Sequence, residues 1–179
     1  AASDVYKRQV GTQVAPTRVH RPNTLSTIFD QMKADGHKPS TEVLSYGTSP
    51  ASPEVSAKLE VAPDTNVTAV RRLRLSDRQP AGLMFDMIRS SIAPAATALE
   101  RDSFETALAE RGVVVTMARQ AVSARKASAP EAQLLRIPAG STVLSIQNIS
   151  YDESGKIAAY GEYLFRADRF ALKNTLFAH

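Results

Sequence analysis

Cysteine is absent from the 179 residues of this chain, which excludes disulfide bonds, thiolate metal sites and a cysteine nucleophile. The three histidines, His20, His37 and His179, are scattered along the sequence, so zinc sites of the usual kinds are not expected. No apolar run approaches the roughly 20 residues of a membrane-spanning helix, and no secretory signal is recognisable near the N-terminus. These absences predict a cytoplasmic protein with no metal, no cofactor and no membrane partner.

The short motifs of several enzyme classes are also missing. The sequence contains no GxxxxGK[ST], GxGxxG, HExxH or GxSxG. Two of the histidines lie in linker or turn sequence and the third is terminal, so nothing supports a serine-histidine-acid triad. A familiar hydrolase, nucleotide-binding enzyme or metalloprotease is therefore not expected.

The composition that remains is that of a soluble globular protein, with 43% hydrophobic and 22% charged residues. The length predicts one domain with room for a short appendage. Of the net charge of +4, residues 1–22 supply +3, because they contain four basic residues and one aspartate. Residues 23–179 are thus nearly neutral, and such a body is not expected to bind DNA by itself.

Hydrophobic patterning and turn signals predict six strands, most of them joined in hairpins, with helices between them. The predicted strands are 42–46, 67–75, 81–90, 113–125, 143–151 and 157–165. The predicted helices are one capped by Asn23 and ending at Gly36, one from Ser52 to Leu59, one opened by a capping box at residues 102–105 and ending near Arg111, and 131–135. The fold class that follows is α+β, with a predominantly antiparallel six-stranded sheet and flanking helices.

Three arginines in the strand 67–75 form the most informative cluster. Because side chains two residues apart share a face of a strand, Arg72 and Arg74 point one way, and Arg71 and Leu73 point the other. Two neighbouring guanidinium groups suit an anion with phosphate-like geometry. The alternative is that they are solvated charges on an exposed face.

Other candidate groups are individually weak. Asp86 lies in a mostly apolar strand and needs a partner, either one of the arginines or the ammonium of a ligand. Ser103 lies where a predicted helix begins. It either caps the helix and has no other role, or it helps the helix N-terminus to bind an anion. Arg125 follows Ser123 on the long strand 113–125, and Tyr163 and Phe165 share one face of the last strand. Together these groups describe a possible pocket for a small anion.

Several short motifs, in order along most of the chain, resemble the effector-binding (UTRA) domain of bacterial GntR-type regulators of the HutC subfamily, whose fold is shared with chorismate lyase. These motifs are Gly11-Thr12-x-Val14, residues 35–39 (DGHKP), Arg72-Leu73-Arg74 with Pro80 six residues later, Ser103, residues 135–144 (LRIPAGSTVL) and residues 163–170 (YLFRADRF). Residues 1–9 show no periodicity and are taken as a non-native start. The resemblance implies that the rest of residues 1–22 is the remnant of a winged-helix wing and linker, and that residues 23–179 are the effector-binding domain.

A narrower resemblance is to the phosphonate-utilisation repressors, carried by residues 123–127 (SARKA), Asp86 and residues 166–168. In aminosugar-phosphate members, the positions of Arg72, Arg74 and Ser103 help to hold the effector. Two glutamates that bind the sugar there correspond here to Met84 and Ala159, and a tyrosine corresponds to Phe165. The anion-binding half is thus kept and the sugar-binding half is lost, which favours a compact phosphonate or phosphate ester.

The resemblance implies a ligand-sensing domain that works as a homodimer and changes DNA binding by an N-terminal winged helix-turn-helix domain absent from this chain. The predicted effector-binding residues are Arg72, Arg74, Met84, Asp86, Ser103, Arg125, Tyr163 and Phe165. Two alternatives stay open: a chorismate-lyase-like enzyme, and a domain that binds no ligand and only dimerises. An enzyme would need a carboxylate poised in the pocket, and the matching strand positions carry Met84 and Ala159.

Overall fold

The computed structural model describes residues 19–21 and 28–172, and its centre is a six-stranded sheet in the order β2-β3-β4-β7-β6-β5. Every neighbouring pair in this sheet is antiparallel. The strands are β2 (Pro39–Pro50), β3 (Asn66–Ser76), β4 (Gln79–Arg89), β5 (Val115–Lys126), β6 (Thr142–Asp152) and β7 (Ile157–Arg166). The predicted α+β class and the six-stranded antiparallel sheet are confirmed.

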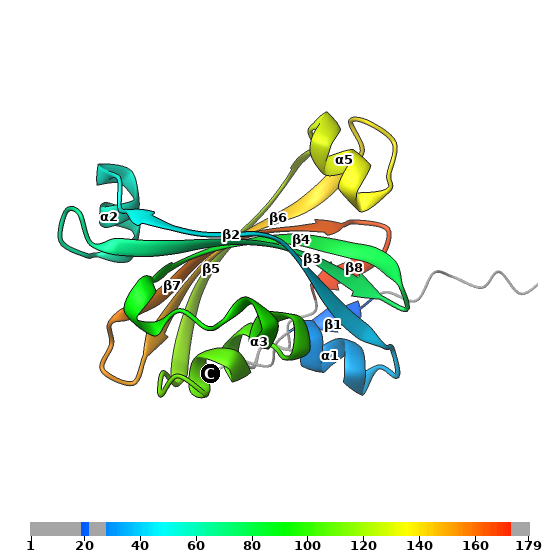
Figure 1. The fold of residues 1–179 in the computed structure, drawn as a ribbon. Helices are drawn as coiled ribbons and strands as arrows, with labels where there is room; N and C mark the ends of the chain where they lie inside the picture. The colour runs from blue at the N-terminus through cyan, green and yellow to red at the C-terminus, as the bar shows by residue number, and fades with distance from the viewer. Residues whose placement is uncertain (1–18, 22–27, 173–179) are drawn as a thin grey trace, which may run out of the picture.

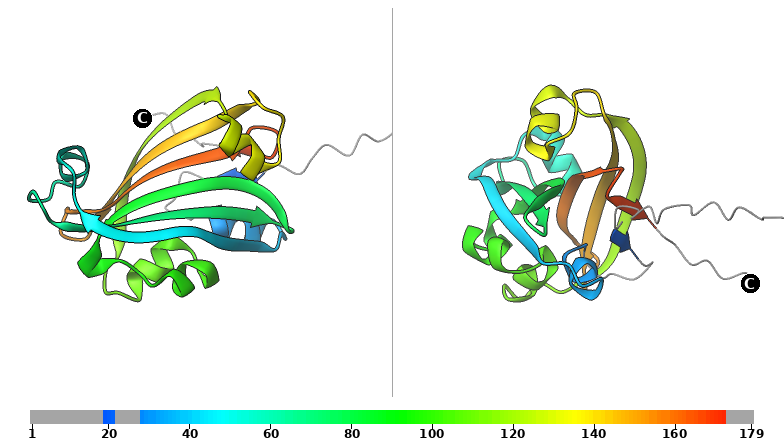
Figure 2. Two further views of the ribbon diagram at one scale, coloured as in Figure 1. Left: turned by 45° about the horizontal axis from the view of Figure 1, so that its top comes forward. Right: turned by 90° about the vertical axis from the view of Figure 1, so that its right-hand side faces the viewer.

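Short helices cover both faces of this strongly twisted and curved sheet (Figures 1 and 2). They are α1 (Ile28–Ala34), α2 (Pro53–Leu59), α3 (Ala96–Arg101), α4 (Phe104–Ala109) and α5 (Ala129–Leu135). Figure 1 shows α1 and α3 on one side of the sheet, and α2 and α5 on the other. None of the helices in the described part of the chain has the length and apolar character needed to cross a bilayer.

One face of the sheet, here called the inner face, is defined by Val70, Arg72 and Arg74 on β3 and by the residues beside them on the neighbouring strands. Val70 packs in a buried apolar cluster with Leu99 of α3 and with Leu108 of α4. A second buried cluster on this face joins Met32 of α1 to side chains of β4, β6 and β7. The part of the inner face around β3 and β4 is therefore enclosed by α1, α3 and α4, and a polar side chain there is removed from water.

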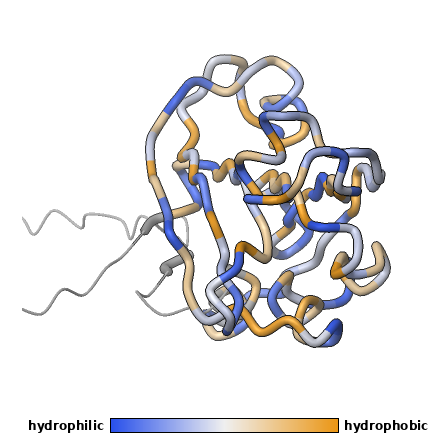
Figure 3. The backbone as a smooth tube through the Cα atoms, turned by 90° about the vertical axis from the view of Figure 1, so that its left-hand side faces the viewer, coloured by the Kyte–Doolittle hydropathy of each residue, from blue (hydrophilic) through white to orange (hydrophobic). Residues whose placement is uncertain are grey.

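Within the described part of the chain, helices cover the opposite or outer face, which bears Arg71 and Leu73, at its two ends. Leu73 packs with Leu135 of α5 in one buried cluster. Met87 packs with Leu59 of α2 in another. Figure 3 shows that hydrophilic and hydrophobic segments follow one another along the folded chain.

The helix signals were placed well where capping residues mark them. Ser52 caps α2 by accepting a hydrogen bond from the Val55 amide at 3.3 Å, and Gly36 ends the α1 segment with a φ of +81°. Ser103 caps α4, and the third residue of this helix, where a capping box requires Glu or Gln, is Thr106. The predicted capping box between Asp102 and Glu105 is therefore wrong by one residue. The Asn23 cap lies outside the described residues.

Other boundaries differ from the predictions. The turn between β3 and β4 consists only of Asp77 and Arg78, both with positive φ, so it is a two-residue hairpin turn rather than the five-residue turn predicted. β2 is twelve residues long, against five predicted. Helix α3 was not predicted, nor was the small parallel sheet of β1 (Val19–Arg21) and β8 (Phe170–Leu172).

Candidate functional site

The two arginines predicted to share a face lie side by side on the inner face. Arg72 and Arg74 are 0% and 2% exposed, whereas Arg71, which points to the opposite face of β3, is exposed. The alternation prediction is confirmed, and the alternative of solvated surface charges is wrong for these two residues. Burying two guanidinium groups is costly unless they are paired and hydrogen-bonded, so their surroundings decide what the site can do.

Arg72 forms a fully buried ion pair with Asp86 of β4. The register sets Asp86 opposite Val70, one inward position along from Arg72, and the Arg72 Nη2 to Asp86 Oδ2 distance is 2.6 Å. The Tyr163 hydroxyl donates to the other carboxylate oxygen at 2.9 Å. Of the two partners left open for Asp86 by the sequence, an arginine is the one present.

The pKa values in this cluster follow from burial and from the nearby carboxylates. Burial is the largest influence on the Arg72 guanidinium and acts to lower its pKa, but the charge and hydrogen bond of Asp86, together with smaller contributions from Tyr163 and Glu105, raise the pKa overall. Burial, reinforced by Asp86, raises the pKa of the Tyr163 phenol well above its usual value. Tyr163 is therefore a neutral hydrogen-bond donor, and Arg72 stays charged, at any physiological pH.

The absence of a side chain at Gly161 makes the Tyr163 contact possible. Gly161 pairs with Asp86 across β4 and β7, and the Tyr163 ring folds back over it toward the carboxylate. A Cβ atom built at Gly161 would lie 2.4 Å from the Tyr163 hydroxyl oxygen. Any larger residue at position 161 would displace the tyrosine from Asp86.

Part of the Arg72 guanidinium has no hydrogen-bond partner. Its face lies over the Phe104 ring, with Cζ 5.0 Å from the ring centroid, so the first residue of α4 covers it. Its Nε and Nη1 are buried and form no hydrogen bond with the residues that the structure describes. Buried donors of this kind are rare in native proteins unless water or a ligand satisfies them. Two donors of Arg72 are thus left for water or a ligand to satisfy.

Arg74, two residues further along the strand and on the same face, is held in a similar aromatic setting. Its Nη1 donates to the hydroxyl of Thr41 on β2, and its Cζ lies 4.6 Å from the centroid of the Phe29 ring on α1. Each of the two arginines therefore rests on an aromatic ring from a different covering helix. This arrangement ties the positions of α1 and α4 to any group that binds the arginines.

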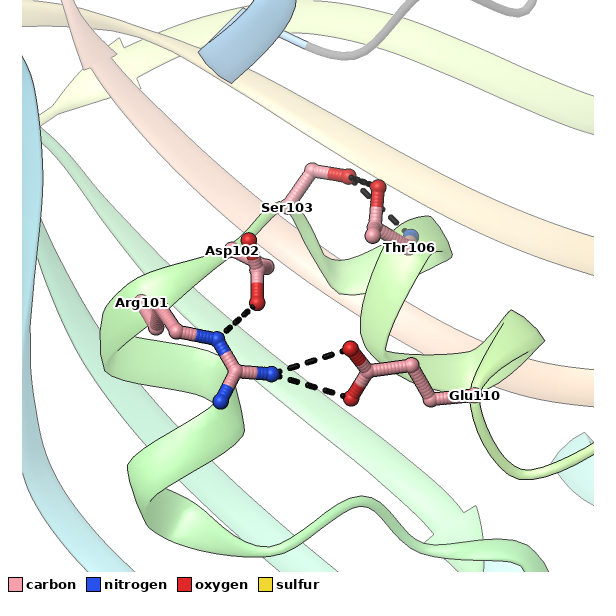
Figure 4. Close-up of polar contacts among 5 residues, drawn as sticks. All are labelled: Arg101, Asp102, Ser103, Thr106 and Glu110. Atoms are coloured by element: carbon pink, nitrogen blue, oxygen red, sulfur yellow. Dashed lines mark hydrogen bonds and ion pairs between the residues drawn. The ribbon is translucent and has the colours of Figure 1, made fainter.

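Ser103 lies at the start of α4, next to the phenylalanine that covers Arg72. Its hydroxyl accepts from the Thr106 amide at 3.1 Å and lies 2.8 Å from the Thr106 hydroxyl, as Figure 4 shows. The preceding Arg101 bonds Asp102 and Glu110, at 2.9 and 3.1 Å from the two Glu110 oxygens, and fixes α3 against the end of α4. The plain cap reading of Ser103 is confirmed, and its place beside Phe104 keeps it near the arginine pair.

The remaining inward candidates form an apolar wall next to the charged groups. Met84 and Phe165 belong to the same buried cluster as Tyr163, and Phe165 stacks on Phe170 with the ring centroids 4.4 Å apart. Asp86 is the carboxylate of β4 that faces the arginines.

Arg125 is the predicted site residue that the structure does not bring to this cluster. The register across β5, β6 and β7 puts Ser123 opposite Ser145, which is opposite Leu164, and this row lies on the outer face. Arg125 bonds both oxygens of Glu131 on α5, at 2.7 and 2.8 Å. This hydrogen-bonded pairing lowers the pKa of Glu131 to about 2. The prediction that Arg125 lies in one site with Arg72 is therefore wrong.

Sequence reasoning missed the groups that support the arginines, namely Phe29, Thr41 and Phe104. Nothing in the local sequence marks these residues, because their role depends on how α1, α4 and β2 pack against β3. In the part of the chain that the structure describes, no group of three or more histidine, aspartate or glutamate side chains is placed to hold a metal ion.

Comparison with known proteins places this geometry in a family. The model of the UTRA domain matches residues 34–171. The HTH-type transcriptional regulator Rv0792c of Mycobacterium tuberculosis is 29% identical over 179 residues, covering 96% of this chain and 65% of that protein. The HTH-type transcriptional repressor NagR of Bacillus subtilis is 24% identical, covering 82% of this chain and 61% of that protein. The chain thus spans less than two thirds of the length of these two regulators.

Solved structures agree on the fold. The effector domain of PhnF from Mycobacterium smegmatis matches with a TM-score of 0.82 at 20% identity, over 89% of this chain and 100% of that chain. A GntR-family transcriptional regulator from Enterococcus faecalis matches with a TM-score of 0.68 at 26% identity, over 75% of this chain and 98% of that one. The match over most of the chain and the shared chorismate-lyase-like fold lead to one conclusion: this chain belongs to the UTRA domain family of GntR-type transcriptional regulators.

Proposed function

We propose that this domain senses a small phosphonate- or phosphate-containing effector through Arg72 and Arg74. The observation that carries the proposal is the buried Arg72 guanidinium, whose Nε and Nη1 have no partner among the described residues. A tetrahedral anion supplies several acceptor oxygens at once and matches the fork of an arginine side chain. The narrower resemblance noted from the sequence is consistent with this ligand class.

The internal Arg72–Asp86 pair gives the site a way to accommodate such a ligand. In the described arrangement Asp86 occupies Arg72 Nη2. An anion that binds two donors on one edge of the guanidinium must also take Nη2, because both edges include it, and Asp86 is then left in need of a cation. An effector that carries an ammonium as well as the anion satisfies both groups, so an aminoalkylphosphonate or amino phosphate ester fits better than a simple anion.

A response can reach the rest of a regulator through the covering helices. Arg72 rests on Phe104 of α4, and Arg74 rests on Phe29 of α1, close to the N-terminal end of the described domain. A ligand that binds one arrangement of these helices better shifts the population toward it. In the full regulator, this shift alters DNA binding by an N-terminal winged helix-turn-helix domain within a homodimer that reads paired half-sites.

A thermal-shift panel tests the proposal. The ligands are inorganic phosphate, 2-aminoethylphosphonate, glucosamine 6-phosphate and urocanate, each with wild type, Arg74→Met and the outward-facing control Arg71→Gln. A ligand at 100 times its Kd stabilises by about 2.7 kcal/mol, or several degrees for a domain of this size. We expect a phosphonate-selective shift that Arg74→Met abolishes and Arg71→Gln retains.

Other outcomes would replace the proposal with one of its rivals. A shift with urocanate alone, unchanged in Arg74→Met, would discard the ligand class. Turnover of chorismate by the purified chain would favour an enzyme on the same fold. A stable dimer that no ligand in the panel shifts would favour a domain that only dimerises.

A further inference from the structure

The outer face of the sheet carries a pocket that the proposed effector site does not use. It has a volume of about 480 Å³ and lies beside α5, over strands β3 to β7. Its polar lining includes Arg71, Arg125, Glu131, Gln147 and Glu162. Of the inner-face group described above, Met84 borders it, whereas the buried arginines and Asp86 face the other side of the sheet.

The strand register arranges a cation, an aromatic ring and a carboxylate in one row across this pocket. Arg71 of β3 pairs with Phe85 of β4, which pairs with Glu162 of β7, which pairs with Gln147 of β6. Neighbouring strands are about 4.8 Å apart, so the backbones of Arg71 and Glu162 lie about 10 Å apart with the ring between them. These positions are on central strands, which hold the charged groups at a fixed spacing.

Both charged groups of this row, Arg71 and Glu162, have unused hydrogen-bonding capacity. Arg71 is exposed and forms no hydrogen bond or ion pair with any residue that the structure describes. Glu162 Oε1 accepts from the Tyr160 hydroxyl at 2.8 Å and from Lys58 Nζ at 3.5 Å, which orients the carboxylate. Its Oε2 accepts no hydrogen bond within the described part of the chain.

The other charges of the pocket are already paired, which limits the ligands that it favours. Arg125 and Glu131 bond each other through both carboxylate oxygens and form one wall. The four ionised side chains that line the pocket, two arginines and two glutamates, sum to zero charge. A lone anion or a lone cation therefore meets one attractive and one repulsive group, whereas a zwitterion of matching length meets two attractive ones.

From this row we propose that the outer-face pocket binds a small linear zwitterion. The anionic end, a carboxylate, pairs with Arg71, the ammonium donates to Glu162 Oε2, and the carbon chain lies over the half-buried Phe85 ring. A zwitterion as short as glycine or 2-aminoethylphosphonate does not span this row. The inference is independent of the proposed effector site, because it uses residues that point to the opposite face.

Titration of the full chain with 6-aminohexanoate, followed by two-dimensional amide NMR, tests the proposal. Glycine provides a zwitterion that is too short, and hexanoate and hexylammonium each lack one charge. Arg71→Gln and Glu162→Gln remove one charge from the row. Arg119→Gln, which removes an exposed β5 guanidinium outside the pocket lining, is the matched control.

We expect the amide resonances of β3, β4 and β7 to shift and to saturate with 6-aminohexanoate. Glycine and each single-charge analogue should bind at least about tenfold more weakly, and so should 6-aminohexanoate to Arg71→Gln or Glu162→Gln. The reason is that each of these changes loses a charge-assisted hydrogen bond. Arg119→Gln should bind as wild type does. Equal binding of hexanoate, or unchanged binding by Arg71→Gln, would overturn the proposal. Loss of binding in Arg74→Met would instead place the ligand on the inner face.

Discussion

Removing the charge of Asp86 should destabilise the domain more than any surface change, because it leaves Arg72 buried as an uncompensated cation. Both side chains are 0% exposed and 2.6 Å apart. Breaking a fully buried pair by removing one partner costs about 3–5 kcal/mol, a large part of the roughly 5–15 kcal/mol that stabilises a typical domain. For a chain of this length, Asp86→Asn should lower Tm by about 6–20 °C.

Urea denaturation and calorimetry of Asp86→Asn, compared with the double variant Arg72→Met/Asp86→Val, measure this effect. The double variant removes both charges and should lose less stability than the single variant, although it changes two residues. A loss below about 1 kcal/mol for Asp86→Asn would refute the reasoning. That result would mean that Arg72 is hydrated in solution and that the inner face is not closed as described.

Three further predictions concern local structure. Ser103→Ala removes the α4 cap and should lower the free energy of unfolding, measured by urea denaturation, by about 1 kcal/mol. An unchanged free energy would mean that the cap does not stabilise α4. Gly82→Ala would set a Cβ 2.5 Å from an aromatic carbon of β7 and should cost about 1–3 kcal/mol, whereas Gly47→Ala meets nothing within 4 Å, and equal Tm values would contradict the close packing. The pKa of Glu131 is lowered to about 2 from 4.5 by its bond to Arg125. The contribution of the Arg125–Glu131 pair to the free energy of unfolding is therefore complete above pH 4.5 and is lost as the pH falls toward 2. Because the pair is partly exposed, Glu131→Gln should cost at most about 1 kcal/mol at pH 7 and less at pH 3, and an equal cost at both would contradict this assignment.

The sequence predicted which arginines share a side of β3, but not which side the helices would cover. Alternation alone separates Arg72 and Arg74 from Arg71. Both sides of β3 contain apolar residues, Val70 on one and Leu73 on the other, so neither is marked as solvent-facing. The burial of the arginines follows from how α1, α3 and α4 pack, which is a tertiary property.

The misplacement of Arg125 has a related cause. Its face depends on the register of β5 against strands far along the sheet, and a shift of one residue in any pairing reverses the face. The missed helix α3 has Leu99 as its buried residue, so it shows no apolar stripe that periodicity could detect. Ser52 and Ser103, by contrast, could be predicted because a cap depends on a few consecutive residues.

The measurement that tests the central claim most directly is the NMR resonance of the Arg72 Nε–H group during titration with 2-aminoethylphosphonate. The resonance is assigned from its absence in Arg72→Met/Asp86→Val, and the Arg71 Nε–H signal serves as the control on the opposite face. The account predicts that the Arg72 resonance moves and saturates with the ligand while that of Arg71 does not follow it. Saturable binding that leaves the Arg72 resonance unmoved would contradict the assignment of the effector site.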